Sequence, residues 1–227
     1  MIETTLPFTV STDQHIDEVL QTLQKWGIAI IPDYIDAGRL LRLNTEFDNI
    51  LTLDTPWAKP SPYSVGQASR VKRRDIDRSH FPTMAEVFEV PFMEQLTQLY
   101  MGDEADFNGD IFVVKDVVGS DHIANELHFD VLQTFKFFLY LTDTTAENGA
   151  FRCVPGSHKV THLIRKRLGP AISYENRHLT RQLPMGESDA LSIEGSAGTL
   201  IIFDTDVFHQ AGRMHEGERR VMRAHSR

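Results

Sequence analysis

The residues whose types and spacing could hold a metal ion are His128, Asp130 and His209. The segment His128-Phe-Asp130 places an imidazole and a carboxylate two residues apart, and in an extended strand such residues project from the same face. That spacing alone is weak evidence, because it often arises by chance. A later β-rich segment, Gly198 to His209, ends in a further histidine. Two imidazoles and one carboxylate on one ion leave half of an octahedral coordination sphere open, which suits non-haem Fe(II) with a keto acid and dioxygen.

Two considerations limit this interpretation. His15-Ile-Asp17 repeats the spacing of the first pair, but it lies at the start of a predicted helix, where residues two apart point to different sides. We therefore reject it as a ligand pair. Zinc hydrolases use similar ligands, so the ligand set leaves the metal open.

A cation that could bind the keto acid follows the last histidine. Arg220 lies eleven positions beyond His209, in the final predicted strand. We expect Arg220 to project into the barrel beside His209 and Arg219 to point the other way, because side chains alternate along a strand. A guanidinium can bind the distal carboxylate of 2-oxoglutarate through two charge-assisted hydrogen bonds. The sequence thus predicts Arg220 as a 2-oxoglutarate ligand.

The elements that must position these residues are short strands. Runs rich in Phe, Val, Ile and Tyr, separated by turn signals such as Gly195-Ser-Ala-Gly198, follow Asp110. This pattern predicts a mainly β fold with flanking helices, built on a double-stranded β-helix of the jelly-roll, cupin-like type. The predicted strands are 111–118, 126–130, 135–142, 150–154, 190–194, 199–204, 207–211 and 219–225.

The N-terminal part is predicted to be a mostly helical scaffold. Helical periodicity over 13–26 is followed by Gly27, by a short apolar strand at Ile28-Ala-Ile-Ile31, and by a second amphipathic helix that ends before Asp54. Residues 54–82 show little periodicity and are predicted to form a long irregular loop. We expect one domain over 1–227, with the scaffold over about 1–105 and the β-helix core over about 106–227.

These motifs together resemble the phytanoyl-CoA dioxygenase (PhyH) family. The resemblance rests on the order and spacing of the His128–Asp130 motif, of Glu147-Asn-Gly149, of Val154-Pro-Gly-Ser-His158, and then of His209 and Arg220. The segment Trp26-Gly-Ile-Ala-Ile-Ile-Pro32 is similar to the family's entry segment, so the resemblance covers nearly the whole chain.

The resemblance implies Fe(II), 2-oxoglutarate as cosubstrate, O2, and hydroxylation or another oxidation of an unactivated C–H bond, with release of succinate and CO2. Lys115 resembles a lysine found there in several relatives, which implies either a contact with 2-oxoglutarate or, equally, an exposed strand lysine. The chain departs from many relatives at Phe129, where they carry Gln. Asp130 favours hydroxylation over halogenation, because halogenating relatives have a small residue there. The resemblance does not imply phytanoyl-CoA as the substrate.

Composition narrows the remaining choices. The net charge of -9 argues against nucleic-acid binding, no apolar run is long enough to span a membrane, and the start of the chain is not a secretory signal. We therefore expect a cytoplasmic enzyme without a nucleic-acid or membrane partner. Cys153 is the one cysteine of the chain and is predicted to be a packed thiol.

The expected substrate is a small molecule. The loop 60–80 and the basic segment His162-Leu-Ile-Arg165-Lys-Arg167 could flank the pocket entrance and favour an anionic or carrier-bound metabolite, although ordinary solvated loops explain them as well. Two alternatives to the oxygenase remain, a cupin-like metal-dependent hydrolase or isomerase and a non-catalytic ligand-binding barrel.

Overall fold

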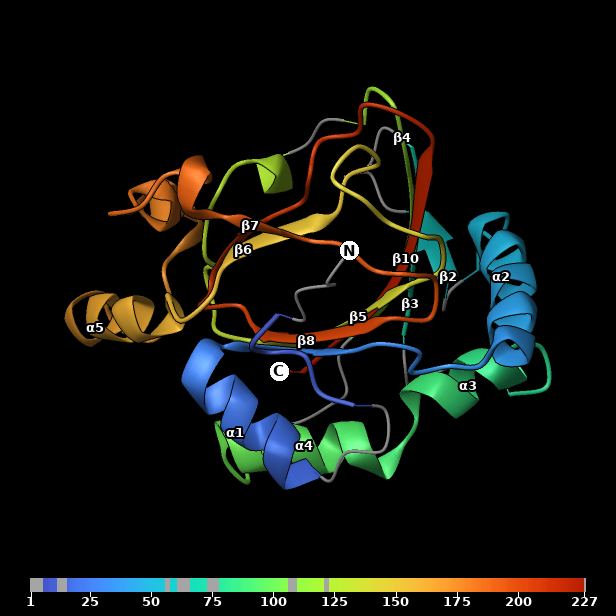
Figure 1. Cartoon of the computed structure of the whole chain (residues 1–227), viewed down its shortest axis with the longest axis horizontal. Coiled ribbons are helices and arrows are strands. Elements are labelled where there is room, and N and C mark those ends of the chain that lie inside the picture. The colour runs from blue at the N-terminus through green and yellow to red at the C-terminus, as the bar shows by residue number, and fades with distance from the viewer. Residues whose placement is uncertain are drawn as a thin grey trace.

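The fold was obtained as a computed structural model. It describes residues 6–11, 16–55, 58–60, 66–72, 78–105, 110–120 and 123–226. Within these residues the structure has two antiparallel β-sheets and a set of helices, most of them packed on the larger sheet (Figure 1). This arrangement confirms the predicted jelly-roll class.

The larger sheet has seven strands in the order β1-β8-β5-β10-β4-β3-β2. All of its neighbouring strands are antiparallel. Strands from the N-terminal part of the chain lie at both edges of this sheet, because β1 pairs with β8 at one edge, while β3 pairs with β4 and carries β2 at the other. The strands are β1 (Ile28–Ile31), β2 (Ala58–Pro60), β3 (Gln67–Val71), β4 (Ile111–Val117), β5 (Phe135–Tyr140), β8 (Leu200–Asp204) and β10 (Glu218–His225).

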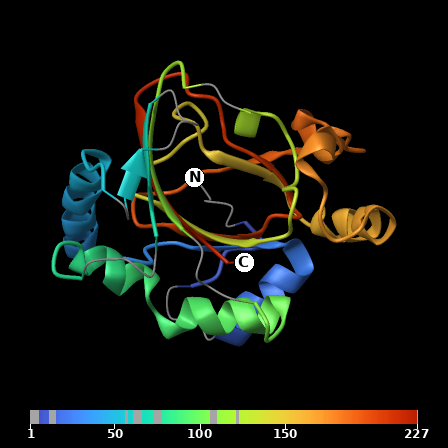
Figure 2. The same ribbon diagram turned by 180° about the vertical axis from the view of Figure 1, so that it is seen from behind.

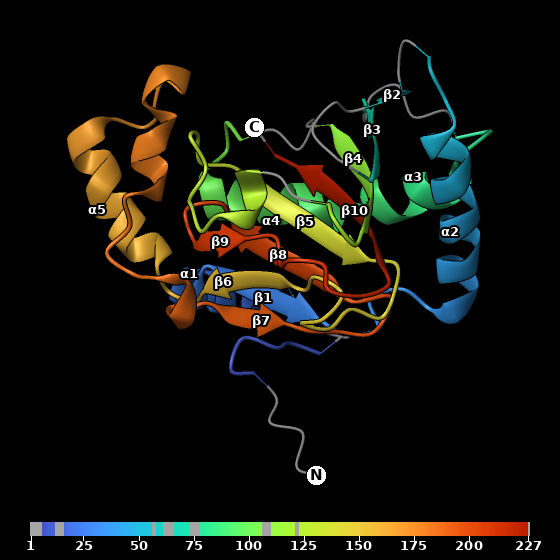
Figure 3. The same cartoon turned by 90° about the horizontal axis from the view of Figure 1, so that it is seen from above.

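The smaller sheet has the order β7-β6-β9 and faces the larger one. It consists of β6 (Phe151–Val154), β7 (Leu191–Ile193) and β9 (Phe208–Gln210). Figure 3 shows these three short strands beside the longer strands of the larger sheet. An apolar cluster between the sheets includes Phe138, Phe151 and Phe203, so the two sheets share one core.

Helices cover the outer face of the larger sheet. The helices α1 (Ile16–Trp26) and α4 (Pro91–Met101) pack on each other, α1 against β1 and β8 and α4 against β5, while α2 (Ala37–Leu51) packs against β3 and β4 and α3 (Pro82–Phe88) packs on α2 (Figure 2). The helix α5 (His158–Leu168) lies at the other end of the molecule (Figure 1). No helix in the described parts of the chain is both long and apolar enough to cross a bilayer.

Strand alternation separates the two faces of the larger sheet. In β10, Met222 and Ala224 pack into the apolar cluster on the helix side, whereas Val221 packs into the cluster between the sheets. Both faces of this strand are therefore buried, as expected for a sheet that is covered on both sides. The odd-numbered residues of β10 face the other sheet.

The main differences from the predicted elements lie outside the core strands. The predicted irregular loop 54–82 contains β2 and β3, and the helices α3, α4 and α5 were not predicted. The segment 126–130 is not a strand but forms one isolated bridge, His128 to His209. The larger sheet draws strands from both sides of the expected boundary near residue 105, because β1, β2 and β3 lie in it beside the later strands. Residues 12–15, which include the start of the predicted helix and the rejected His15, lie outside the described residues.

Candidate metal centre and cavity

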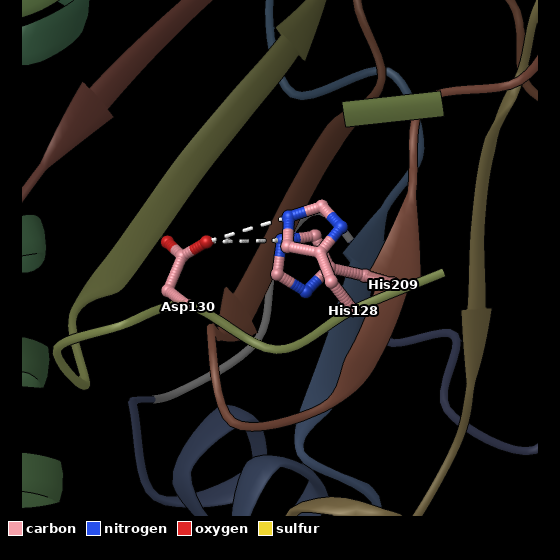
Figure 4. Close-up of side chains that lie close together, drawn as sticks. All are labelled: His128, Asp130 and His209. Carbon is pink, nitrogen blue, oxygen red and sulfur yellow. Dashed lines mark ion pairs between the residues drawn. The ribbon is translucent and has the colours of Figure 1, made fainter. Parts of the chain in front are cut away.

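The predicted ligands His128, Asp130 and His209 converge at one point between the sheets. Their ligand atoms all lie within 4.8 Å of one another. Nε2 of His128 lies 3.6 Å from Oδ1 of Asp130, and Nε2 of His209 lies 3.7 Å from the same oxygen (Figure 4). On an octahedral ion with bonds of about 2.1 Å, such atoms would be roughly 3 Å apart. The two distances from Asp130 to the histidines therefore need to shorten by less than about 1 Å to fit one ion.

Hydrogen bonds between distant segments hold the ligands in place. The amide of His128 donates to the carbonyl of His209 (3.0 Å), and the amide of His209 donates to the carbonyl of His128 (2.7 Å). The amide of Asp130 donates to the carbonyl of Thr205 (3.0 Å). Phe129, between the two ligands, is fully buried against Phe208 in a separate apolar cluster. The segment 128–130 is thus held to β9 by one bridge, and the predicted strand does not form.

The tautomers of both imidazoles follow from their partners. Nδ1 of His128 lies 2.7 Å from the carbonyl oxygen of Glu126, and Nδ1 of His209 lies 2.8 Å from that of Val207. A carbonyl oxygen only accepts, so each Nδ1 carries the proton and each Nε2 keeps its lone pair. Burial, followed by the neighbouring His128, holds the pKa of His209 well below its usual value. Both Nε2 atoms are therefore prepared to bind a cation.

Lys136 fixes the carboxylate. Its Nζ lies 2.6 Å from Oδ2 of Asp130, which leaves Oδ1 to face the two imidazoles. Burial by itself would raise the pKa of Asp130, but Lys136 and the two histidines hold that pKa well below its usual value. The carboxylate is therefore ionised and offers a single oxygen to a metal.

The three ligands line a cavity of about 560 Å³. Its other walls are largely apolar and come from both sheets, including Phe112, Phe138 and Phe203. Such a volume is typical of pockets for small organic molecules. The charged wall residues comprise four cations and two carboxylates, so the cavity favours anions even before a divalent cation binds. These charged residues are Lys136, Arg177, Arg219, Arg223, Asp116 and Asp130.

The predicted orientation of Arg220 is wrong. Arg220 does not line the cavity, and its guanidinium donates to Glu218 (2.7 Å) and Asp48 (3.0 Å) and stacks over Phe47 on the helix side of the sheet. Arg219 is the residue that faces inward: it is 4% exposed, and it donates to Oδ2 of Asp116 (2.6 and 3.2 Å) and to the carbonyl of Gly149.

Lys115 also lies on the outer face. It pairs with Arg220 in the register of β4 and β10, and its Nζ lies 3.0 Å from Glu218. It is not part of the cavity wall, and its expected contact with 2-oxoglutarate stays a prediction. The basic segment of α5 behaves differently from expectation too, because Arg165 is buried rather than placed at an entrance.

Arg165 instead anchors the segment that carries the ligands. Its Nε donates to both oxygens of Asp206 (2.8 and 2.9 Å), and its Nη2 donates to the carbonyl of Asp130 (2.8 Å). A guanidinium that joins a buried carboxylate to the backbone of a metal ligand restrains both. Sequence reasoning missed this role because nothing in the local pattern brings 165 and 206 together.

Lys136 and Arg223 are two further charged residues of the cavity wall that sequence reasoning missed. Lys136 is a charged residue inside the apolar segment Phe135–Tyr140, and that exception was the available signal, since buried lysines are rare without a partner. Arg223 lies four residues after Arg219 in β10 and therefore faces the same side of the sheet. A correct assignment of the inward face of β10 would have identified both arginines.

The fold and the site together define a class of protein: a double-stranded β-helix that brings two histidines and one carboxylate together where they could hold one metal ion. The family model described as "Phytanoyl-CoA dioxygenase (PhyH)" matches residues 23–222. The chain therefore belongs to the phytanoyl-CoA dioxygenase family, which confirms the resemblance seen in the sequence.

Individual relatives are more distant. "Dioxygenase andF" of Emericella variicolor is 22% identical over 93% of this chain and 73% of its own length. The epimerase SnoN from nogalamycin biosynthesis, solved with Fe3+, alpha ketoglutarate and nogalamycin RO, is 17% identical over 93% of this chain and 82% of its own, with a TM-score of 0.66. HygX from Streptomyces hygroscopicus, solved with nickel, 2-oxoglutarate and hygromycin B, is 15% identical over 91% of this chain and 85% of its own, with a TM-score of 0.57. At these identities the solved structures confirm the double-stranded β-helix fold.

Proposed function

We propose that this protein is an Fe(II)- and 2-oxoglutarate-dependent oxygenase that hydroxylates, or otherwise oxidises, an unactivated C–H bond of a small organic molecule. The observation that carries the proposal is the convergence of His128, Asp130 and His209 on the wall of a largely apolar cavity. Family membership supports the same conclusion. A small-molecule substrate, a cytoplasmic location and the lack of a nucleic-acid or membrane partner belong to this proposal as well.

The described ligands fit ferrous iron. Two neutral imidazoles and one monodentate carboxylate on one face leave room for a bidentate keto acid and dioxygen. Bound there, iron would supply the activation of dioxygen and the oxidative decarboxylation of 2-oxoglutarate to succinate and CO2. The chain's own part is to orient the reactants and to exclude water, which the apolar walls around Phe138, Phe151 and Phe203 would do.

The far carboxylate of 2-oxoglutarate needs a cation inside the cavity, and we assign that role to Arg219 in place of Arg220. An arginine has five N–H donors, and Arg219 uses three of them on Asp116 and Gly149. The remaining two can bind a carboxylate from a guanidinium that is already fixed in position. Gly149 lets the backbone approach closely, since a Cβ there would lie 2.6 Å from Sδ of Met214.

An anaerobic titration tests the proposal before any substrate is known. Adding 2-oxoglutarate to the Fe(II)-loaded protein should produce a visible metal-to-ligand charge-transfer band. We expect Arg219→Gln to raise the 2-oxoglutarate concentration needed for half of that band by about tenfold or more, since one charge-assisted pair is lost. Arg220→Gln is the matched control, because it lies on the same strand and faces away from the cavity.

The ligand variants complete the test. His128→Ala, Asp130→Ala and His209→Ala should each abolish the band and the substrate-stimulated release of succinate in a metabolite screen. Turnover by rigorously metal-free protein, or the absence of any band with intact protein, would overturn the proposal. Oxygen-independent turnover would point instead to a cupin-like hydrolase or isomerase.

A further inference from the structure

Arg223 is a cation of the cavity wall that the proposed chemistry does not use. It lies in the middle of β10, with the same inward parity as Arg219 and Val221. Its Nε is buried and has no hydrogen-bond partner within the described parts of the chain. Arg219 and Arg220, by contrast, each have a carboxylate partner. Arg223 therefore has donors that the folded chain leaves free.

An aromatic ring holds its guanidinium in position without occupying those donors. Cζ of Arg223 lies 4.9 Å from the centre of the Phe112 ring. The cation–π contact orients the plane of the guanidinium, and it leaves the N–H groups directed outward from its edge. The edge of a fixed guanidinium is the geometry that binds carboxylate, sulfate or phosphate oxygens.

The charge of Arg223 is not balanced by the carboxylates around it. Asp130 is paired with Lys136 at 2.6 Å, and Asp116 is paired with Arg219 at 2.6 Å. Burial lowers the pKa of Arg223, against the opposing effect of these two carboxylates. A desolvated cation without a partner is unfavourable, so an anion in the cavity would be stabilised there.

The position of Arg223 separates it from the proposed cosubstrate cation. Arg223 pairs with Phe138, two residues along β5 from Lys136, which contacts the metal ligand Asp130. Arg219 is four residues earlier on the strand, which corresponds to roughly 13 Å between the Cα atoms. The wall can thus receive two anionic groups, one from the cosubstrate and one from another molecule. Arg177, exposed and part of the same wall, adds a further positive charge.

We propose that Arg223 binds an anionic group of the organic substrate, a carboxylate, sulfate or phosphate, in a subsite of the cavity beside the metal centre. This inference rests on the proposed function, which makes the molecule bound there the organic substrate. It names the substrate class, an organic anion small enough for a cavity of about 560 Å³. Recognition by a fixed guanidinium would select the anion over its neutral ester or amide, because only the charged group offsets the buried cation.

Inorganic sulfate is the probe. We would load the protein with Ni2+, saturate it with 2-oxoglutarate, and measure sulfate binding by calorimetry at constant ionic strength against chloride. Sulfate should bind saturably to the wild type, and Arg223→Gln should weaken that binding by about tenfold or more. Arg220→Gln should bind sulfate like the wild type. The 2-oxoglutarate affinity of Arg223→Gln should stay within about threefold of the wild type, unlike that of Arg219→Gln.

Each opposite result has a distinct meaning. Equal sulfate affinity in the wild type and in Arg223→Gln, or no sulfate binding by the wild type, would overturn the subsite. Loss of 2-oxoglutarate affinity in Arg223→Gln would also overturn the subsite, because it would show that Arg223 binds the cosubstrate. Should Arg223→Gln not fold, Arg223→Lys keeps the charge without the planar edge and should still weaken sulfate binding. If 2-oxoglutarate does not bind the wild type, the proposed function fails, while the sulfate comparison in the Ni2+ form still tests Arg223.

Discussion

Replacement of Arg165 by methionine should couple the stability of the fold to the metal centre. Arg165 is buried in α5 and binds both oxygens of Asp206 through Nε. The same guanidinium donates to the carbonyls of Asp130 (2.8 Å), Pro170 (2.8 Å) and Val131 (3.1 Å). Methionine keeps much of the apolar length of the side chain but removes the charge and all of these donors. We call the Arg165 hydrogen bonds to Asp206 and to these carbonyls the clamp. The substitution therefore separates the effect of the clamp from that of side-chain packing.

The expected cost is large because it leaves a carboxylate without its partner. Removing one member of a buried ion pair typically destabilises a protein by about 3–5 kcal/mol, which for a chain of this length corresponds to roughly 10 °C in Tm. Burial raises the pKa of Asp206 to about 6, and Arg165 opposes that rise. Without Arg165 the pKa rises further, so Asp206 takes up a proton more readily in the folded state. The destabilisation should therefore be smaller at pH 5 than at pH 8.

Thermal and urea unfolding of the metal-free protein would measure this effect. Arg167→Met on the exposed side of the same helix is the control and should change the free energy of unfolding by no more than about 0.5 kcal/mol. The double variant Arg165→Met with Asp206→Asn should cost less than the sum of the two single changes, by about 1 kcal/mol or more. Ni2+ should also bind more weakly to Arg165→Met, because the backbone at Asp130 loses its anchor. Strict additivity, or a loss below about 1 kcal/mol for Arg165→Met, would refute the clamp.

Three further predictions concern the charges around the site. Lys136→Met should lower the Tm of metal-free protein and enlarge the Tm increase caused by Ni2+, because the cation then replaces the charge that Lys136 supplies to Asp130; equal increases in variant and wild type would contradict this. A hydrogen bond to Asp204 raises the pKa of the half-exposed His162, so its stabilisation, about 1 kcal/mol at most, should be full below pH 6.5 and lost as the pH rises through the raised value. The Tm of His162→Gln should then fall below that of the wild type at pH 5.5 but match it at pH 8.5. Arg220→Gln should cost about 1 kcal/mol or less, because its ion pairs are partly exposed, and a loss above about 2 kcal/mol in urea unfolding would show that its outward position is wrong.

The core of the fold was predictable because burial leaves a periodic trace in the sequence. The strand Ile28–Ile31 and the stop at Gly27 are confirmed, with Gly27 at φ 71°. Cys153 is buried as expected, and burial raises the pKa of its thiol. The two short strands β2 and β3 were not predicted, because they lie in a polar segment and depend on pairing with β4 for their stability.

The convergence of the three candidate metal ligands was predictable, whereas the arginine that faces the cavity was not. His128, Asp130 and His209 are identified by residue type and spacing alone. The choice between Arg219 and Arg220 requires knowing which residues of β10 face the cavity. A shift of one residue in that assignment moves every side chain to the opposite face of the sheet. Apolar residues normally settle that assignment, but Val221 and Met222 are both buried, on opposite faces. The sequence contained no local signal for the correct face.

Contacts between segments that are distant in the sequence explain why the metal site can exist before the metal binds. The peptide groups of His128 and His209 exchange two hydrogen bonds, and carbonyl oxygens within two residues of each histidine fix both tautomers. Lys136 supplies a positive charge to the carboxylate from a third strand. Because the chain itself supplies these restraints, the metal need not drive folding, and its stabilising effect should follow simple mass action. Metal-free protein should therefore unfold in one cooperative transition whose midpoint rises smoothly with metal concentration, and a metal-free chain without that transition would show that the ion organises the site.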